Sequence, residues 1–344
     1  MSRLDELIEK LCPDGVEMHE LQELFTTRNG YTPSKSKSEF WENGTVPWFK
    51  MEDIRANGNI LSDALQHVNE CAVKGQLFPE NSIIVATSAT VGEHALITVP
   101  SLANQRFTYL MVKPEYEDRF MPKFLFYYCY KLDKYCLQNL NQSSFASVDM
   151  KKFAKFKFPV PPLEVQREIV HILDSFTLLT AELTAELTAR KKQYSYYRDT
   201  LIQKECKSEK VKLNTVCEIY DGTHQTPKYT NGGIPFVSVE NIDDLYGTQK
   251  FISTEAYAKY KIKPRIGDVF MTRITAGIIG KCTVVERNDD LAYYVSLALL
   301  RPNADILDSK YLKYYLESVW GRRELSKWIL WDATPTKINK DDIG

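Results

Sequence analysis

The sequence lacks the features of a membrane-bound or secreted protein. Its longest apolar stretches, such as residues 82–86 and 295–300, end well before the roughly 18 apolar residues that a membrane-spanning helix requires. Residues 1–10 form an acidic amphipathic start without the apolar segment of a signal peptide. With 344 residues, the chain suits two domains rather than one. We therefore expect a soluble, cytoplasmic, globular protein with no membrane contact.

Cysteine and histidine are present, but not at the spacing of a metal site. Seven cysteines are scattered along the chain without a Cys-x-x-Cys pair, and the five histidines do not cluster. A scattered set of this kind is typical of reduced, buried thiols. No nucleophile elbow is recognisable either. We expect no catalytic residue, no metal and no cofactor in this chain.

A basic excess is also missing. The 44 lysines and arginines are balanced by 45 aspartates and glutamates, which gives a net charge of −1. Because nucleic-acid-binding proteins usually carry a basic excess, any role on DNA must depend on local charge placement. Basic runs do occur at 151–157, 190–192 and 204–210. They suit either phosphate contacts or an ordinary solvated surface.

The sequence does contain one order of motifs twice. Asn29-Gly30 matches Asp221-Gly222, and a turn, short strand and acidic-Ile ending at 44–54 matches 233–242. A strand-like segment beginning at Phe107 matches one beginning at Val295, and an aromatic-rich helix follows each. Short Val/Ile-rich strands alternate with turn residues and helices in both copies. We therefore predict an α+β fold with two globular domains produced by duplication.

Aromatic residues recur at helical spacing in the helix of each copy. This spacing favours packing onto a sheet, with base stacking as the alternative. The residues are Phe124, Tyr127 and Tyr128 in the first copy, and Tyr311, Tyr314 and Tyr315 in the second.

A long helix with an apolar seam is predicted between the copies, with Pro161 or Pro162 in its first turn. Its apolar residues recur mostly in steps of three and four, which is typical of a coiled coil, over roughly 35 residues or about 50 Å. Within it, Thr180 to Leu187 read Thr-Ala-Glu-Leu twice. One further unit would lengthen the helix by about 6 Å and rotate the second domain about the helix axis. The seam needs a partner helix and consists of Ile169, Ile172, Phe176, Leu179, Leu183, Leu187, Tyr194, Tyr197 and Leu201.

These patterns divide the chain into three segments. Residues 1–158 hold an N-terminal helix and the first domain, residues 159–208 the spacer helix with its repeats, and residues 209–344 the second domain. By the logic of the duplication, a second proline motif and a second helix should follow Ile343. We therefore expect a chain shortened at its C-terminus, naturally or artificially, that lacks the partner of its own spacer helix.

Polar loops carry the candidate DNA-binding groups. Arginine suits guanine, asparagine and glutamine suit adenine, and hydroxyl, lysine and backbone groups suit phosphates. An ordinary solvated loop is the alternative for each residue. In the first copy the candidates are Arg28, Asn29, Tyr31, Lys35, Lys37, Thr87, Ser88, Thr90, Asn104, Gln105, Arg106, Gln142, Ser143 and Ser144. In the second copy they are Thr223, His224, Gln225, Lys228, Arg273, Lys281, Tyr293, Tyr294 and Lys337.

Taken together, the chain resembles the specificity subunit of a Type I restriction-modification system. The resemblance covers essentially the whole length and includes the motif Phe158-Pro-Val-Pro-Pro-Leu-Glu-Val-Gln166. Tandem Thr-Ala-Glu-Leu units are characteristic of the Type IC group. Val165 departs from the acidic residue that usually precedes the glutamine.

The resemblance implies a non-catalytic subunit that binds double-stranded DNA. Such a subunit recognises an asymmetric, two-part target, with one half-site read by each domain. It docks two methyltransferase subunits, which use S-adenosylmethionine to methylate adenine, and restriction subunits, which use ATP and Mg²⁺. Two alternatives stay open at this point: a DNA-modifying enzyme, either an adenine methyltransferase or a nuclease, and a tandem scaffold that binds only proteins.

Overall fold

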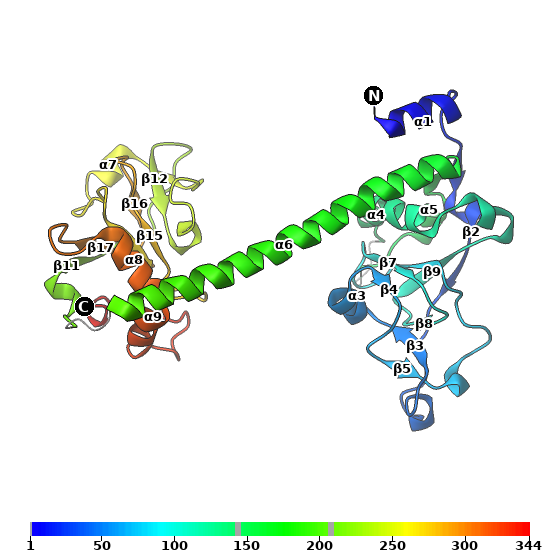
Figure 1. Cartoon of the computed structure of the whole chain (residues 1–344), viewed down its shortest axis with the longest axis horizontal. Coiled ribbons are helices and arrows are strands. Elements are labelled where there is room, and N and C mark those ends of the chain that lie inside the picture. The colour runs from blue at the N-terminus through cyan, green and yellow to red at the C-terminus, as the bar shows by residue number, and fades with distance from the viewer. Residues whose placement is uncertain (1, 142–145, 206–209) are drawn as a thin grey trace. The chain divides into compact units, whose positions relative to one another are not determined.

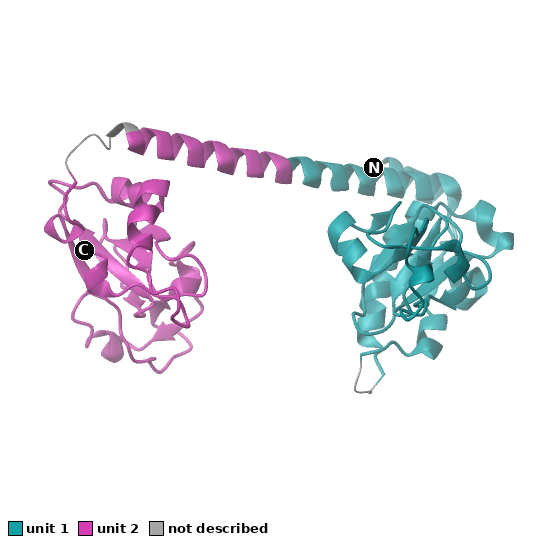
Figure 2. Ribbon diagram, turned by 90° about the horizontal axis from the view of Figure 1, so that it is seen from below, with its two compact units in different colours: residues 1–183 teal, residues 184–344 magenta. Residues whose placement is uncertain are grey.

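The computed structural model describes residues 2–141, 146–205 and 210–344 (Figure 1). The chain separates into two compact units, residues 1–183 (unit 1) and residues 184–344 (unit 2) (Figure 2). In the described part of the chain, no helix has both the length and the apolar character needed to cross a membrane. The finer division at residues 158 and 208 stays a prediction.

In the described part of unit 1, two larger sheets form the body of the domain, beside a two-stranded sheet of β1 (Met18–Glu20) and β10 (Lys157–Pro159). The larger has the strand order β2-β9-β6-β7-β4, and the smaller has the order β5-β3-β8. Neighbouring strands are antiparallel except for the parallel pairs β4 with β7 and β3 with β8. The strands are β2 (Phe25–Asn29), β3 (Val46–Phe49), β4 (Ile60–Leu61), β5 (His67–Val68), β6 (Ser82–Ala86), β7 (His94–Ile97), β8 (Leu102–Ala103) and β9 (Phe107–Val112).

The larger sheet of unit 1 is covered on both faces. Along β6, Ile83 and Val85 enter a core shared with helix α4 (Pro122–Gln138), whereas Ile84 and Ala86 enter a second core shared with the smaller sheet. Because both faces are buried, the strand is a continuous apolar run rather than an alternating one. Its two neighbours, β9 and β7, are largely buried for the same reason.

Unit 2 repeats this plan with fewer strands. Its sheets have the orders β11-β17-β14-β15 and β13-β12-β16, and β12 and β16 are parallel like β3 and β8. The duplication and the α+β class are therefore confirmed. The elements are β11 (Cys217–Asp221), β12 (Ile234–Val237), β13 (Phe251–Ile252), α7 (Thr254–Tyr257), β14 (Val269–Thr272), β15 (Cys282–Val284), β16 (Ala292–Tyr293), β17 (Leu297–Pro302), α8 (Ser309–Glu317) and α9 (Val319–Ser326).

One detail of the predicted duplication is wrong by two residues. Asn29 faces Thr108, and the equivalent Asp221 faces Ala298, so Phe107 corresponds to Leu297 rather than to Val295. Side chains alternate along a strand with a period of two. A shift of two residues therefore keeps every side chain on its face, and the apolar pattern cannot reveal it.

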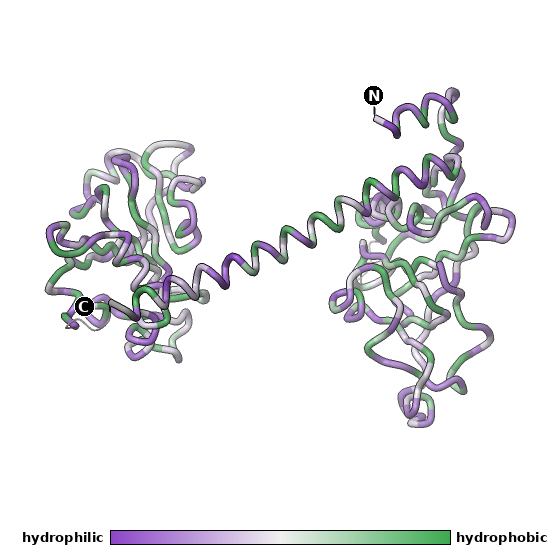
Figure 3. The backbone as a smooth tube through the Cα atoms, in the orientation of Figure 1, coloured by the Kyte–Doolittle hydropathy of each residue, from purple (hydrophilic) through white to green (hydrophobic). Residues whose placement is uncertain are grey.

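The predicted long helix is present as α6 (Leu163–Glu205), a helix of 43 residues. In Figure 3, hydrophobic (green) and hydrophilic (purple) residues alternate along this helix. Ile169 and Ile172 are half-buried in unit 1, but the rest of the predicted seam is exposed; Phe176 is 63% and Leu187 55% exposed. The helix is confirmed, and its coiled-coil partner stays a prediction.

The aromatic stripes mainly pack, as their spacing predicts. Phe124 is buried, and Tyr127 and Tyr128 pack against the same core. In unit 2, Tyr315 packs against the core, whereas Tyr311 and Tyr314 are 41% and 40% exposed.

The described cysteines are free, and five of them are buried: Cys12, Cys129, Cys136, Cys217 and Cys282. Burial raises the pKa of Cys136 and of Cys217 to about 12, which keeps both thiols protonated at neutral pH. The prediction of burial is wrong for Cys71, because it lies in an exposed 3-10 turn capped by Asn69. Cys206 lies outside the described residues.

The N-terminal segment completes unit 1. Helix α1 (Arg3–Leu11) begins with a capping box between Ser2 and Asp5. Strand β1 (Met18–Glu20) pairs with β10 (Lys157–Pro159), which leads directly into α6. The remaining short helices are α2 (Leu21–Leu24), α3 (Met51–Asn57) and α5 (Met150–Ala154).

Candidate nucleic-acid interface

Three of the predicted loops of unit 1 meet at one end of its larger sheet, where strands begin or end. Because β2 and β6 both pair antiparallel with β9, the ends of β2 and β6 lie beside the start of β9. The residues that follow β2 and β6 and precede β9 are therefore neighbours. This end of the sheet, called edge 1 here, brings together Arg28, Asn29, Tyr31, Thr87, Ser88, Thr90, Asn104, Gln105 and Arg106.

A chain of hydrogen bonds crosses edge 1. The Thr108 hydroxyl donates to Asn29 Oδ1 at 2.8 Å, and the Thr87 and Thr108 hydroxyl oxygens are 2.8 Å apart. Since Thr108 has a single proton, Thr87 is the donor of the second bond. Thr87 is buried and Asn29 exposed, so the chain joins the interior to a surface amide.

Arg28 is held at edge 1 by its own packing. Its guanidinium carbon lies 4.0 Å from the centroid of the Phe78 ring, and Nη2 donates to the Gln76 carbonyl oxygen at 2.8 Å. Phe78 in turn stacks on Tyr109, with ring centroids 3.5 Å apart. Desolvation raises the pKa of the buried Tyr109, so that side chain stays neutral. The side chain of Arg28 is exposed yet ordered, which suits a bidentate contact to guanine.

The other polar candidates of unit 1 differ in how far they are engaged. Tyr31 is half-buried, and its hydroxyl accepts from Lys74 N at 2.7 Å and donates to the Ala72 carbonyl oxygen at 3.3 Å. The Thr32 hydroxyl donates to Gln105 Oε1. Lys35 and Arg106 are exposed, and Lys37 Nζ lies 3.8 Å from Glu39. Gln142, Ser143 and Ser144 lie outside the described residues.

The corresponding edge of unit 2, edge 2, is formed by the ends of β11 and β14 and the start of β17. The predicted residues around it are Thr223, His224, Gln225, Lys228, Arg273, Tyr293, Tyr294 and Lys337. His224, Gln225 and Lys228 are exposed, and Thr223, Tyr294 and Lys337 are partly exposed. The Thr223 hydroxyl donates to the Gln225 carbonyl oxygen at 3.2 Å, which shapes the turn after β11.

Two of the predicted residues of unit 2 are buried. Arg273 Nη1 binds Asp221 Oδ1, and Nε donates to the Ile338 carbonyl oxygen at 3.1 Å. Tyr293 is 1% exposed and packs edge-on against Phe270. A base contact by either side chain would therefore require edge 2 to open. Sequence could not reveal this, because Asp221 and Arg273 are far apart in the chain.

The two edges share a backbone frame and differ in side chains. Asn29 and Asp221 are equivalent, as are Thr87 and Arg273, which directly follow β6 and β14. Edge 1 joins these positions through neutral hydroxyl and amide groups, whereas edge 2 joins them by an ion pair. One scaffold thus presents two different sets of polar groups.

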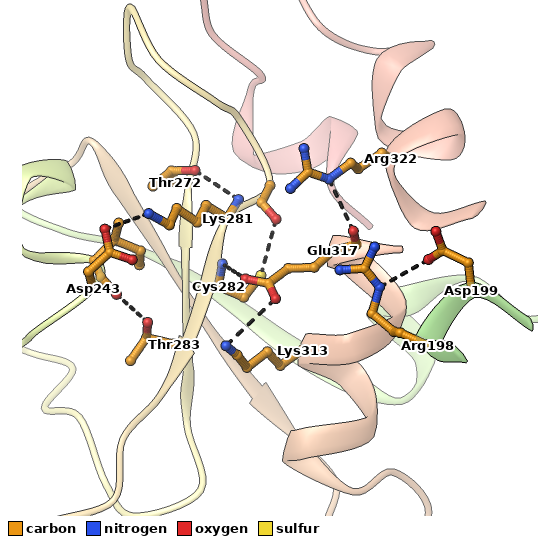
Figure 4. Close-up of polar contacts among 12 residues, drawn as sticks. Arg198, Asp199, Asp243, Thr272, Lys281, Cys282, Thr283, Lys313, Glu317 and Arg322 are labelled. Carbon is orange, nitrogen blue, oxygen red and sulfur yellow. Dashed lines mark hydrogen bonds and ion pairs between the residues drawn. The ribbon is translucent and has the colours of Figure 1, made fainter. Parts of the chain in front are cut away.

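The backbone of Lys281 lies beside the end of β14, because its N–H donates to the Thr272 hydroxyl at 3.0 Å, and its side chain lines a cavity of about 540 Å³ within unit 2 (Figure 4). Its Nζ is 2.5 Å from Asp243 Oδ2. In the same cavity wall, Glu317 Oε1 accepts from the backbone N–H of Cys282 at 2.9 Å, and Oε2 lies 3.6 Å from Lys313 Nζ. Two ion pairs, Lys281 with Asp243 and Lys313 with Glu317, thus line this cavity.

The motif at 158–166 has a structural role that sequence patterns alone did not reveal. Gln166 is fully buried, and its Oε1 accepts from the backbone N–H of Met121 at 2.9 Å. Its amide nitrogen donates to the carbonyl oxygens of Arg119 and Pro161, each at 2.8 Å. The glutamine therefore fixes the first turn of α6 to unit 1.

Further along α6, one aspartate in each unit accepts hydrogen bonds from another segment of that unit and so attaches the helix to it. Asp174 accepts from Lys123 Nζ and from the Tyr127 hydroxyl, each at 2.7 Å. Burial opposes its ionisation, but these two bonds outweigh burial and lower the pKa of Asp174. In unit 2, Asp199 Oδ1 accepts from the backbone N–H of Val319, at the start of α9, at 3.2 Å.

Comparison with known proteins gives a consistent match. A family model described as the Type I restriction modification DNA specificity domain matches residues 13–190. The EcoprrI specificity subunit, a Type I restriction enzyme component of Escherichia coli, is 56% identical over 241 residues, which are 65% of this chain and 60% of the relative. The EcoR124I/EcoR124II specificity subunit of the same species is 35% identical over 200 residues, 54% of this chain and 48% of the relative. The matched regions thus span about half the length of these relatives.

A solved structure shows that the fold extends across both units. A chain from a structure concerned with complex assembly and conformational transition of the type I R-M system superposes with a TM-score of 0.61. The match covers 96% of this chain and 84% of that chain at 21% sequence identity. At this identity the likeness concerns the fold.

Proposed function

Because the chain belongs to the family of Type I restriction modification DNA specificity domains, we propose that it reads a bipartite, asymmetric DNA sequence, with one half-site per unit. The observation that carries this proposal is the repeated sheet frame with different polar groups at its equivalent edges. Two domains with one scaffold and different contact groups suit two different half-sites. Recognition then follows from side chains directed at base edges.

At edge 1 the proposed division of labour follows from chemistry. Arg28 presents a planar guanidinium fork for guanine, and Asn29 an amide for adenine. The exposed cations Lys35, Lys37 and Arg106 suit phosphates, where they fix position without reading sequence. At edge 2, His224, Gln225 and Lys228 are the exposed groups of the same kinds.

The chemistry on DNA is proposed to belong to partner subunits, in keeping with the names of the relatives as specificity subunits. Two methyltransferase subunits would methylate adenine with S-adenosylmethionine, and restriction subunits would use ATP and Mg²⁺. The exposed apolar residues of α6, such as Phe176, Leu183 and Leu187, offer the chain's surface for a partner helix or subunit. The two Thr-Ala-Glu-Leu units would set the length of the unspecified spacer.

Substitution of Arg28 by alanine tests the assignment of half-sites. The wild-type chain, bound to its methyltransferase partner, is first used to select its preferred duplex from random DNA. We expect Arg28→Ala to lose about 1–3 kcal/mol of discrimination at one base pair of one half-site, as a lost bidentate contact does. Discrimination at the other half-site should not change.

The matched control is Arg55→Ala, which removes an exposed arginine from α3 of the same unit. It should leave both half-sites as in the wild type. Loss of discrimination at both half-sites in Arg28→Ala would argue against separable domains. A wild-type complex that selects no two-part sequence would contradict the proposed function itself.

A further inference from the structure

Unit 2 exposes large apolar side chains next to edge 2. Trp331 is 65% exposed, Trp328 56% and Leu330 43%. Single exposed apolar residues are ordinary on protein surfaces, but several neighbouring ones that include two tryptophans indicate a contact surface. These apolar side chains are not among the polar groups of edge 2 that are proposed to contact DNA.

The loop that carries Trp331 is held firmly to edge 2. The backbone N–H of Leu330 donates to the Lys337 carbonyl oxygen at 2.8 Å, which closes a loop of residues 331–336. The N–H of Thr275 donates to the Thr336 carbonyl oxygen at 3.0 Å, and that of Ile338 to the Arg273 carbonyl oxygen at 2.9 Å. The loop is therefore attached to the residues that directly follow β14, where edge 2 lies.

The duplication assigns the same position to a loop of unit 1. There, Ser88, in the turn after β6, bridges to Ser147, and Leu140 bridges to Val148. In unit 2, Ile274 and Leu330 both bridge to Lys337. In each copy, the described residues that bound this loop thus lie beside the turn that follows β6 or β14. The two loops differ in sequence, and residues 142–145 of the first lie outside the described residues. A shared position with variable sequence is what a specificity element requires.

The chemistry of the loop suits base edges better than phosphates. Asp332 follows Trp331 and is exposed, and its carboxylate would be repelled by a phosphate but can accept from a cytosine amino group. An indole ring offers a flat apolar surface that fits a thymine methyl group or the face of a base. These features favour DNA in a groove as the occupant of this surface.

We propose that Trp331 is a specificity-determining residue that contacts base pairs in the half-site read by unit 2. This inference rests on the proposed function, since it presupposes that edge 2 faces DNA. Trp331 acts through direct apolar contact, and the backbone hydrogen bonds at both ends of its loop fix the position of the segment that carries the indole. Removal of the indole therefore weakens the reading of one half-site and spares the other.

The experiment measures binding of the full chain, with its methyltransferase partner, to three duplexes. These are the sequence selected by the wild type and two versions with one or the other half-site scrambled. For Trp331→Ala, the affinity ratio between the intact duplex and the one scrambled in the unit 2 half-site should fall by about 10-fold to 100-fold. The ratio for the other half-site should stay at its wild-type value, and Trp331→Phe should retain part of the preference.

Ile306→Ala is the matched control, because Ile306 is also 65% exposed but lies beyond the opposite end of β17. It should bind all three duplexes like the wild type. Unchanged ratios in Trp331→Ala, or an equal loss on every duplex, would overturn the inference while leaving the proposed function standing. Loss of the methyltransferase partner without a change in the ratios would identify the surface as a protein contact and would also overturn it. A wild type without half-site preference would remove the proposed function and this inference together.

Discussion

Gly30 and Gly222 show how closely the backbone is packed at the two edges. A Cβ added to Gly30 would lie 2.3 Å from the Ala103 carbonyl oxygen, and one added to Gly222 would lie 2.5 Å from the Tyr294 carbonyl oxygen. Both obstacles are backbone atoms, which cannot rotate away. The turns after β2 and after β11 therefore require glycine, because a Cβ at either position would collide with backbone atoms.

Alanine at either position should destabilise its unit. We expect Gly30→Ala and Gly222→Ala each to lower the free energy of unfolding by about 1–3 kcal/mol, the usual cost of overpacking. Gly232→Ala is the control, because no atom lies within 4 Å of a Cβ at that position. Chemical denaturation followed by circular dichroism measures the difference. Equal stability of Gly30→Ala and Gly232→Ala would show that the edge can relax.

At the scale of single residues, the sequence predicts matches between local motifs well, but it predicts poorly which side chains are buried and what they contact. The pairing of Asn29-Gly30 with Asp221-Gly222 was recoverable, because both members are local in sequence. The burial of Arg273 was not, since it depends on Asp221 and on the Ile338 carbonyl, both distant in the chain. Neither was the exposure of Trp331, because an apolar residue in a loop is ordinarily expected to pack.

At the scale of elements, α6 is the best-predicted part of the molecule. Its apolar period and the prolines near its start are local properties. The helix begins at Leu163, so Pro161 and Pro162 precede its first turn instead of lying in it. Its attachments were not predictable, since Gln166 and Asp174 bind partners on segments more than 40 residues away. The alignment of β9 with β17 between the two copies was wrong by two residues, because a shift of two preserves the apolar pattern.

Asp174→Asn should loosen α6 from unit 1. The pair with Lys123 is partly exposed, so we expect a loss of only about 1 kcal/mol at neutral pH. Because the folded-state pKa of Asp174 is lowered, its stabilisation is present above the unfolded pKa and disappears as pH falls through the folded one. The difference between wild type and variant should therefore shrink below about pH 4.

Denaturation of both proteins at neutral and acidic pH checks this expectation. Glu182→Gln serves as the control, since it neutralises an exposed carboxylate elsewhere on the same helix. A difference between wild type and Asp174→Asn that is as large at pH 3 as at pH 7 would exclude the ion pair as its cause.

At the scale of the whole molecule, the organisation follows from a duplicated domain and one long helix. The duplication was visible in the sequence because framework motifs recur in the same order, and the sheet orders of both units confirm it. The bases that each edge would read do not follow from the sequence, since a side chain specifies a base only through geometry. The repeated Thr-Ala-Glu-Leu units lie within α6 and are exposed, so they are free to vary in number without disturbing either core.

The central claim is that two reading domains are separated by a helix of countable length. Its most direct test is to insert a third Thr-Ala-Glu-Leu unit after Leu187 and to map adenine methylation produced with the methyltransferase partner. Four added residues lengthen a helix by about 6 Å, or one to two base pairs at about 3.4 Å each. The account predicts that both half-sites stay the same while the spacer grows by one or two base pairs. An unchanged spacer, or an altered half-site sequence, would contradict it.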